Sequence, residues 1–279
     1  MQVKILFMGT PDFAVASLAA LADAGHEICA VVTQPDRPVG RKGTLTPPPV
    51  KVCAQAHGVP VLQFERIRRP EGRQALSALA PDLFVTAAFG QILSQRVLDI
   101  PRLGTINVHA SLLPAYRGSA PINWCLLRGE ARTGVTTMMT DAGIDTGDML
   151  LREETDILPE ETAEELSARL SKIGAETLLR TLRALEAGTL VRTPQDESAA
   201  SYYPMLDKEL GRIYVEDMGT IDVPEEVRPF FDYAAYGRKV REDDKGCFVN
   251  DGYLMRSGLA FRERYRGPED IPKEYRVFA

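Results

Sequence analysis

Short apolar segments alternate with helical patterns along the first two thirds of the chain, and this alternation constrains the fold more than any other feature. Apolar strands are expected at residues 3–8, 27–32, 59–62, 82–86, 105–109 and 135–139. Helical patterns are expected at residues 13–21, 50–57, 73–79 and 163–187. Strands that alternate with helices in this order predict an α/β fold, a doubly wound and mostly parallel sheet with helices on both faces.

One of these predicted strands ends in an unusual way, because Asn107 and His109 follow each other at a spacing of two. Residues i and i+2 of a strand point to the same side, so the two side chains face a common point. Open parallel sheets place their sites at the carboxyl ends of the strands. Taken singly, a histidine at a strand end is more often structural, and an asparagine there is more often a turn former.

Composition and charge exclude several classes of function. The chain has 279 residues and a formal net charge of -6, which argues against wholesale non-specific nucleic-acid binding but allows a local basic patch. No apolar stretch is long enough to cross a bilayer, and the first residues do not resemble a secretory signal. The four cysteines lack zinc-ligand spacing. We therefore expect a cytoplasmic protein with no membrane contact and no metal.

The first glycine-containing turn, Met8-Gly9-Thr10-Pro11, lacks the G-x-G-x-x-G spacing that dinucleotide binding requires. NAD binding is therefore disfavoured, and the other loops must carry the chemistry.

Five motifs in order carry a family resemblance: GTPDFA at 9–14, TQPDRPVGR at 33–41, NVHASLLP at 107–114, RGSAP at 117–121 and DAGIDTGD at 141–148. Together they resemble the signature of the folate-dependent formyltransferases, of the type that acts on methionyl-tRNA. The resemblance runs from about Val3 to about Ile213. It implies a Rossmann-like formyltransferase fold and transfer of a formyl group from 10-formyltetrahydrofolate to the amino group of initiator methionyl-tRNA.

The resemblance makes Asn107, His109 and Asp145 the catalytic residues. Formyl transfer to an amine passes through a tetrahedral oxyanion, so donors must be placed where that charge develops. Asn107 offers an amide NH₂ and His109 a ring N–H, while Asp145 would orient the imidazole and help to remove the amine proton through a water. Asp145, which has glycines on either side in the motif, could alternatively serve only as a turn residue.

The same resemblance assigns the binding residues. The loops implied to bind the folate contain Phe89, Gly90, Gln91, Ile92, Leu93, Ser111, Leu112, Leu113 and Pro114. The residues implied to bind the tRNA substrate are Thr10, Phe13, Arg37, Arg41 and Lys42. Arg41 is the expected contact to the acceptor end, in an insertion loop at 37–43 that would otherwise be an ordinary solvated loop.

Three regions are expected: a formyltransferase catalytic domain at 1–188, a linker at 189–213 and an atypical carboxyl-terminal region at 214–279. The family would continue into a small basic β-barrel that binds tRNA, whereas residues 214–279 show too few alternating strands and no net basic character. This region weakly resembles the end of an antirestriction protein that mimics DNA. We therefore expect a monomer with an intact transfer site and weakened tRNA binding, since phosphate contacts dominate affinity for a nucleic acid.

Two alternatives remain open from the sequence. The chain could be another enzyme of the same family, acting on an amino sugar nucleotide or hydrolysing formyltetrahydrofolate. It could instead be a fused binding protein without turnover, whose acidic tail engages a DNA-binding partner.

Overall fold

A computed structural model describes residues 3–39, 44–203, 206–212, 214–215, 228, 231–243, 247–249 and 252–254. Contacts divide the chain into two compact units. Unit 1 comprises Met1–Ile122 and Ala131–Tyr202, and unit 2 comprises Asn123–Glu130 and Tyr203–Ala279. Each unit is described by itself below.

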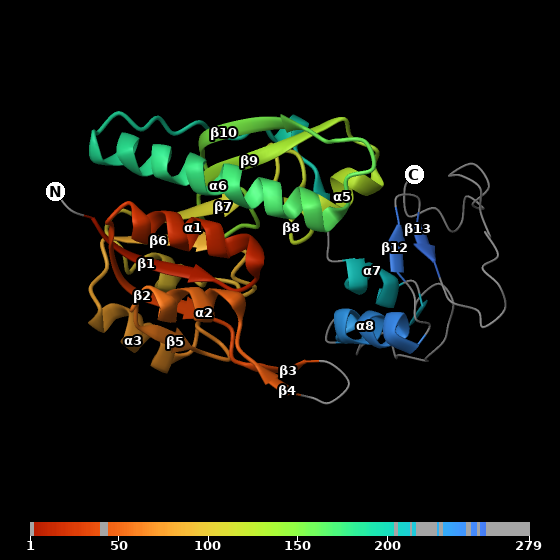
Figure 1. The fold of residues 1–279 in the computed structure, drawn as a ribbon, viewed down its shortest axis with the longest axis horizontal. Coiled ribbons are helices and arrows are strands. Elements are labelled where there is room, and N and C mark those ends of the chain that lie inside the picture. Colours follow the sequence, from red (N-terminus) through yellow and green to blue (C-terminus); the bar gives the residue numbers. More distant parts are fainter. Residues whose placement is uncertain are drawn as a thin grey trace. The chain divides into compact units, whose positions relative to one another are not determined.

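Unit 1 is built on a seven-stranded sheet of order β10-β9-β7-β6-β1-β2-β5 (Figure 1). Its strands are β1 (Lys4–Gly9), β2 (Glu27–Thr33), β5 (Val61–Gln63), β6 (Leu83–Ala87), β7 (Thr105–His109), β9 (Arg132–Met139) and β10 (Met149–Asp156). Neighbouring strands from β7 to β5 run parallel, while β9 pairs antiparallel with both β7 and β10. The predicted doubly wound, mostly parallel sheet is therefore confirmed.

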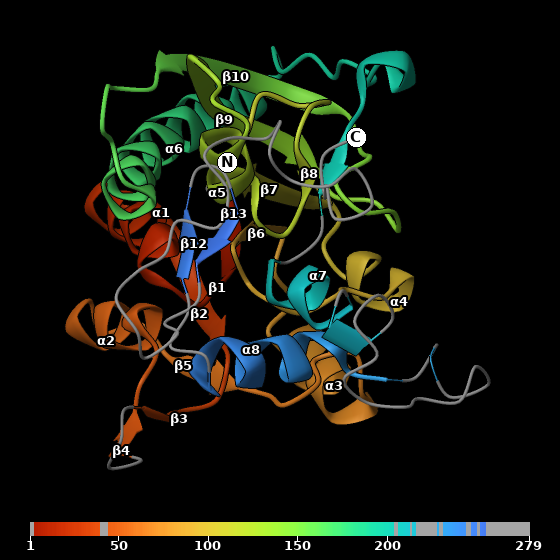
Figure 2. The same ribbon diagram turned by 90° about the vertical axis from the view of Figure 1, so that its right-hand side faces the viewer.

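Helices cover both faces of this sheet, as Figures 1 and 2 show. The helices of unit 1 are α1 (Asp12–Asp23), α2 (Pro49–Ala56), α3 (Pro70–Ala78), α4 (Gln95–Leu98) and α6 (Ala163–Glu186). Helix α1 packs against α2 and α6. On the other face, Leu76 of α3 and Val97 of α4 join strand residues such as Leu6 and Phe84 in one buried cluster. Because both faces are covered, the ends of the strands and their loops are left for a site.

The segment that the sequence predicts as a loop around residues 37–43 contains a hairpin. Strands β3 (Arg37–Val39) and β4 (Thr44–Thr46) pair antiparallel, with Arg37 opposite Thr46. The predicted contact residues Arg41 and Lys42 lie outside the described residues. Further elements absent from the expectation include the strand β10 (Met149–Asp156), the helix α4 (Gln95–Leu98), the short strand β8 (Arg117–Gly118) and the 3₁₀ turn Glu197–Ala199. The amide of Arg117 in β8 donates to Ser201, just before β11 (Tyr202–Tyr203).

Helix α6 packs tightly against the sheet. Its first turn is closed by a capping box, in which Thr162 and Glu165 satisfy each other's backbone N–H groups. Farther along, the Ser171 hydroxyl donates to the Phe13 carbonyl of α1 (2.7 Å). A β-carbon at Gly174 would lie 2.9 Å from a methyl of Val108, so only glycine lets α6 approach β7 this closely. Helix α6 therefore packs directly against β7, the strand that carries Asn107 and His109.

Unit 2 contains most of α5 (Pro121–Leu127), α7 (Leu206–Arg212), α8 (Tyr233–Asp243) and a hairpin of β12 (Cys247–Val249) and β13 (Gly252–Leu254). Arg241 of α8 pairs with Asp207 of α7 (2.7 Å), and the ring of Phe231 meets those of Tyr233 and Tyr236 edge-on. Trp124 stacks at a tilt on Tyr203. The described part of the atypical region is therefore helical with one short hairpin.

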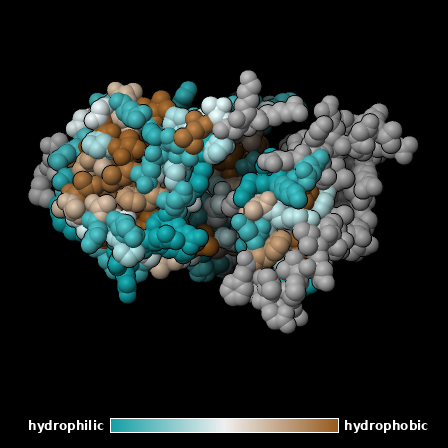
Figure 3. All heavy atoms as spheres, turned by 90° about the horizontal axis from the view of Figure 1, so that it is seen from below, coloured by the Kyte–Doolittle hydropathy of each residue, from teal (hydrophilic) through white to brown (hydrophobic). Residues whose placement is uncertain are grey.

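Within the described residues, no helix is both long enough and apolar enough to cross a membrane. Figure 3 shows hydrophilic residues mixed with hydrophobic ones on the lower face of unit 1, as on an ordinary protein surface.

Replacement of Gly174 by valine should separate α6 from β7, because the added side chain meets Val108 and Val135 in a filled core. We expect a loss of about 1–3 kcal/mol in the free energy of unfolding, measured with urea. The matched control is Lys172→Val, which places the same β-branched residue on an exposed position of α6. Equal stability of the two variants would contradict this packing argument.

Candidate active site

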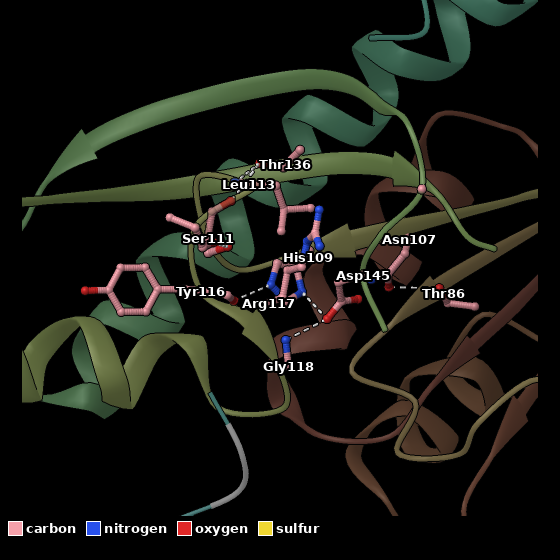
Figure 4. A network of polar contacts seen from close by, with 12 residues as sticks. Thr86, Asn107, His109, Ser111, Leu113, Tyr116, Arg117, Gly118, Thr136 and Asp145 are labelled. Carbon is pink, nitrogen blue, oxygen red and sulfur yellow. Dashed lines mark hydrogen bonds and ion pairs between the residues drawn. The ribbon is translucent and has the colours of Figure 1, made fainter. Parts of the chain in front are cut away.

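Asn107 and His109 lie on β7, which ends between the carboxyl end of β6 and the antiparallel strand β9. The imidazole of His109 is buried, with 6% of its surface exposed, whereas Asn107 is partly exposed. Figure 4 shows both side chains with the carboxylate of Asp145. The structure therefore brings the three predicted catalytic residues into one region.

The amide of Asn107 has a defined orientation. Thr86 is its register partner on β6, and the Thr86 hydroxyl donates to Oδ1 of Asn107 at 2.8 Å. A hydroxyl hydrogen can only point at the carbonyl end of the amide. The NH₂ group of Asn107 is consequently directed away from Thr86 and is the end that can donate to a bound molecule.

The imidazole of His109 is held at both nitrogens. Nε2 lies 2.9 Å from the Tyr116 carbonyl, which can only accept, so Nε2 carries a hydrogen. Nδ1 lies 3.6 Å from Oδ2 of Asp145, within ion-pair range. The ring N–H expected from the sequence to face the reaction therefore points at Tyr116 in this geometry, and Nδ1 is the nitrogen next to the carboxylate.

Asp145 reaches His109 because its loop folds back over the sheet. Strand β9 is antiparallel to β7, so Met139 at its end pairs with Ile106 near the start of β7. The loop after β9 must then run back toward His109. Asp145 adopts a positive φ of 52°, and its Oδ2 also accepts the amide hydrogen of Gly118 (2.9 Å). The carboxylate is thus fixed between a ring nitrogen and a backbone donor.

A side-chain network centred on the buried guanidinium of Arg117 supports this loop. Nε2 of Gln195 donates to the carbonyls of Asp145 (2.8 Å) and Gly147 (2.7 Å). Its Oε1 accepts from the guanidinium of Arg117, which is only 6% exposed and also pairs with Glu197 (2.7 Å). The chain Glu197–Arg117–Gln195 therefore connects the segment predicted as a linker to the Asp145 loop.

The ion pair between Arg117 and Glu197 shifts the pKa of both side chains. The hydrogen bonds and charge of Glu197 raise the pKa of Arg117, and those of Arg117 lower the pKa of Glu197. A carboxylate with a lowered pKa contributes its stabilisation above its ordinary value and loses it as the pH falls through the lowered one. The support of the Asp145 loop is accordingly complete at neutral pH.

The expected folate loops have mixed roles. Gln91 is occupied structurally, since its side chain accepts from the Ile67 amide and donates to the Phe64 carbonyl, each at 2.7 Å. Phe89 is buried and its carbonyl accepts the Thr10 hydroxyl, whereas Ile92 is 75% exposed. The remaining two members of this loop are Gly90, which has a positive φ of 78°, and the partly buried Leu93.

The second expected folate segment is a turn fixed by Thr136 of β9. The Thr136 hydroxyl donates to the Ser111 carbonyl (2.7 Å) and accepts the Leu113 amide hydrogen (3.1 Å). The Ser111 hydroxyl donates to the carbonyl of Ala115, and the Leu113 side chain is fully buried. Leu112 and Pro114 are partly buried. Backbone groups and the partly buried residues are therefore what this turn can offer to a ligand.

The residues expected to bind the tRNA substrate differ in their contacts and their exposure. The Thr10 hydroxyl is bonded to the Phe89 carbonyl, and the Phe13 side chain is buried in unit 1. Arg37 is exposed on β3 and pairs with Glu65 at 2.6 Å. Within the described ranges, no group of three or more histidine, cysteine or acidic side chains could hold a metal ion.

Sequence reasoning missed four residues of this site: Thr86, Thr136, Gln195 and Glu197. The two threonines lie within predicted strands, and the strand order needed to place Thr86 beside Asn107 is a tertiary property. Gln195 and Glu197 lie in a polar segment about eighty residues from Arg117, and no local pattern marks that contact.

Comparisons with known proteins agree with this fold and motif set. The formyl transferase family model matches residues 1–182. A methionyl-tRNA formyltransferase of Geobacter sulfurreducens is 57% identical over 211 residues, which are 76% of this chain and 67% of that protein. One of Syntrophus aciditrophicus is 56% identical over 221 residues, 79% of this chain and 71% of that protein.

Solved structures agree at the level of the fold. Glycinamide ribonucleotide transformylase 1 from Symbiobacterium toebii matches with a TM-score of 0.58 and 20% identity, covering 70% of this chain and 95% of that one. A sugar 3N-formyl transferase, solved with dTDP and 5-N-formyl-THF, matches with a TM-score of 0.56 and 20% identity, covering 74% and 71%. A second family model, that of antirestriction proteins, matches residues 148–255, less than half of the chain.

Replacement of Gln195 by leucine should loosen the Asp145 loop, because two loop carbonyls lose their donor and Arg117 loses an acceptor. A hydrogen-bond loss of about 1–3 kcal/mol corresponds to roughly 5- to 150-fold faster hydrogen exchange at the Gly118 amide, which Asp145 holds. Exchange measured by NMR or mass spectrometry tests this. The exposed Gln55→Leu is the control, and unchanged exchange in Gln195→Leu would show that the tether is dispensable.

Proposed function

The chain belongs to the formyl transferase family, with methionyl-tRNA formyltransferases among its relatives, and from this premise we propose that it formylates the amino group of initiator methionyl-tRNA with 10-formyltetrahydrofolate as donor. It is thus an enzyme of one-carbon group transfer. The observation that carries the assignment of the chemistry is the Asn107 amide, which Thr86 orients next to the His109–Asp145 pair.

The residues present fit a folate donor. A pterin requires backbone hydrogen-bonding groups together with apolar surface. The loop after β6 offers both, since Gly90 exposes its backbone and Ile92 is 75% exposed. Ile144, next to Asp145, is also 51% exposed. Exposed apolar side chains on these two loops support binding of a flat, partly apolar co-substrate, which supplies an activated formyl group.

Asn107 would stabilise the charge that develops during transfer. Attack of the amine nitrogen on the formyl carbon converts the carbonyl oxygen into an oxyanion before the bond to N10 of the folate breaks. The NH₂ group of Asn107 is oriented before the reaction, because Thr86 holds the other end of the amide. A preoriented donor needs no reorganisation when the charge forms, and this is the main source of its effect on rate.

His109 and Asp145 would manage the proton. The attacking amine must lose a proton, and N10 of the departing folate must gain one. The Asp145 carboxylate is an acceptor held at Nδ1 of His109 and at the Gly118 amide. We propose that this pair removes the amine proton, directly or through a water, and that His109 donates to the oxyanion when its bond to the Tyr116 carbonyl is exchanged for one to the substrate.

The tRNA substrate is favoured over an amino sugar nucleotide because of the relatives. Those named methionyl-tRNA formyltransferases are 52–57% identical to this chain, whereas the sugar formyltransferase structure at 20% identity shows a shared fold alone. The exposed Arg37 on the β3–β4 hairpin supports an RNA contact, and Arg41 and Lys42 lie in the segment that joins the two strands. Formyl transfer to a sugar nucleotide, free formate, or folate binding without turnover would identify one of the alternatives.

Loss of the Asn107 donor should slow the chemical step. We expect Asn107→Leu to lower kcat by roughly 10²–10³, with a small change in KM for either substrate. Thr86→Val keeps the shape but removes the orienting hydroxyl, so a smaller fall in kcat, about tenfold, is expected. Transfer of labelled formyl from 10-formyltetrahydrofolate to methionyl-tRNA provides the measurement. The exposed Thr46→Val is the control, and full activity of Asn107→Leu would overturn the assignment.

We also propose that tRNA binding is weaker than in the relatives, because residues 214–279 lack the basic character expected of a tRNA-binding region. The KM for methionyl-tRNA should exceed that of the Geobacter sulfurreducens relative, while kcat at saturating tRNA stays within about tenfold of its value. Equal KM values at the same salt concentration would refute this. Arg37→Gln should raise the KM for tRNA further and flatten its salt dependence.

A further inference from the structure

Ser201, in the segment predicted as a linker, is connected to His109 through a single residue. Ser201 follows Tyr116 by 85 residues in the sequence, and its hydroxyl oxygen accepts the amide hydrogen of Tyr116 at 2.9 Å. The carbonyl of the same Tyr116 accepts a hydrogen bond from Nε2 of His109, also at 2.9 Å. A serine far away in the sequence thus contacts the one peptide segment that binds the candidate catalytic imidazole.

The backbone at Tyr116 is held in an unfavourable conformation. Its φ is 61°, in the left-handed region that residues other than glycine rarely adopt. Such a conformation costs free energy and persists only where the surroundings hold it. Figure 4 shows the Tyr116 ring pointing away from His109, so the backbone carbonyl alone contacts the imidazole. The direction of this carbonyl therefore depends on whatever holds the turn.

Ser201 holds the turn on both sides of Tyr116. Its carbonyl accepts the Arg117 amide hydrogen (2.8 Å), and its amide donates to the Pro114 carbonyl (3.3 Å). Any residue except proline could form these two backbone bonds. The bond from the Tyr116 amide to the hydroxyl is the one that requires a particular side chain. A substitution at position 201 can therefore remove this bond and leave the backbone pairing in place.

Two acceptors compete for the ring hydrogen of His109, because a neutral imidazole carries only one. The Tyr116 carbonyl is within hydrogen-bond distance of Nε2, whereas Oδ2 of Asp145 lies 3.6 Å from Nδ1, which is too long for a hydrogen bond. The hydrogen bond made at one ring nitrogen sets the state of the other. If the Tyr116 carbonyl turned away, the hydrogen would be better placed on Nδ1, where Asp145 can accept it.

We propose that Ser201 is a positioning residue that keeps the hydrogen of neutral His109 on Nε2, acting through the amide and the carbonyl of Tyr116. Its consequence for the reaction rests on the proposed function, in which the Nε2 hydrogen is passed from the Tyr116 carbonyl to the oxyanion. With the hydrogen on Nδ1, Nε2 would present a lone pair to the developing negative charge and could not stabilise it.

The first test reads the tautomer directly, from the ¹⁵N NMR signals of the His109 ring at a pH where the ring is neutral. The chain has three histidines, so a His109→Gln variant assigns the signals. The wild type should carry the hydrogen on Nε2. Ser201→Thr keeps the hydroxyl and should give the same result. Ser201→Val has the shape of threonine without the hydroxyl, and its signals should shift toward the Nδ1–H form.

The second test measures formyl transfer by the same pair of variants. Ser201→Val should lower kcat about tenfold and leave the KM values for both substrates unchanged, since the hydrogen bond it removes acts on the imidazole and not on a bound molecule. Ser201→Thr should restore the wild-type kcat. The matched control is Ser198→Val, which removes an exposed hydroxyl from the same segment and should alter neither the tautomer nor kcat.

Three results would overturn the proposal. One is a hydrogen on Nδ1 in the neutral wild-type ring, which needs no variant and so does not depend on whether a variant folds. Another is the wild-type tautomer in Ser201→Val, even with reduced stability, because a purely structural serine would behave in this way. The third is an equal shift in Ser198→Val. The NMR measurement requires no substrate, so it is separate from a failure of the proposed function, in which the wild type would not formylate methionyl-tRNA.

Discussion

The parallel register between β6 and β7 is the constraint on which the candidate site depends. It places Thr86 opposite Asn107, and only there can a hydroxyl fix the carbonyl end of that amide. Both faces of the sheet are covered by helices, so the side chains that remain available lie at strand ends and in the loops. Gly174 allows α6 to support β7 from one face, which keeps the strand and its two polar residues in place.

The antiparallel strand β9 imposes a second constraint, because the loop that follows it needs support. The buried guanidinium of Arg117 contributes to that support. Because β9 ends beside the start of β7, the loop that carries Asp145 must run back across the sheet and adopt a positive φ at Asp145 itself. Such a loop needs support, and Arg117 provides it through Gln195. Burying a guanidinium is costly, and replacement of an ion pair by apolar residues is often neutral for stability. An apolar residue in place of Arg117 could not donate to Oε1 of Gln195, whose Nε2 donates to the two loop carbonyls, so the network is better explained by positioning than by stability.

The sequence predicted most elements that local residue patterns determine. It did not predict contacts between residues that come together only in the folded chain. Apolar periodicity placed six of the seven strands of the main sheet and the long helices of unit 1 close to their observed bounds, and the spacing of Asn107 and His109 predicted a shared face. The seventh strand, β10, was missed because most of its side chains are polar. The hairpin of β3 and β4 was missed because its strands are short, exposed and rich in residues read as turn formers. Gln195 was read as part of a linker, since only the folded chain brings it to Arg117. The tautomer of His109 depends on the Tyr116 carbonyl, which no side-chain pattern encodes.

Some arginines of unit 1 are paired with carboxylates and others are not, and the difference bears on how an acidic protein handles anionic substrates. Arg117, Arg132 and Arg169 are neutralised by carboxylates and serve the fold. With a net charge of -6, the chain as a whole repels both an anionic folate and a tRNA at long range. Attraction must then be local and within about a Debye length of an unpaired cation. The positions where cations are left unpaired are therefore informative about where an anion binds, more than the overall charge or the number of basic residues.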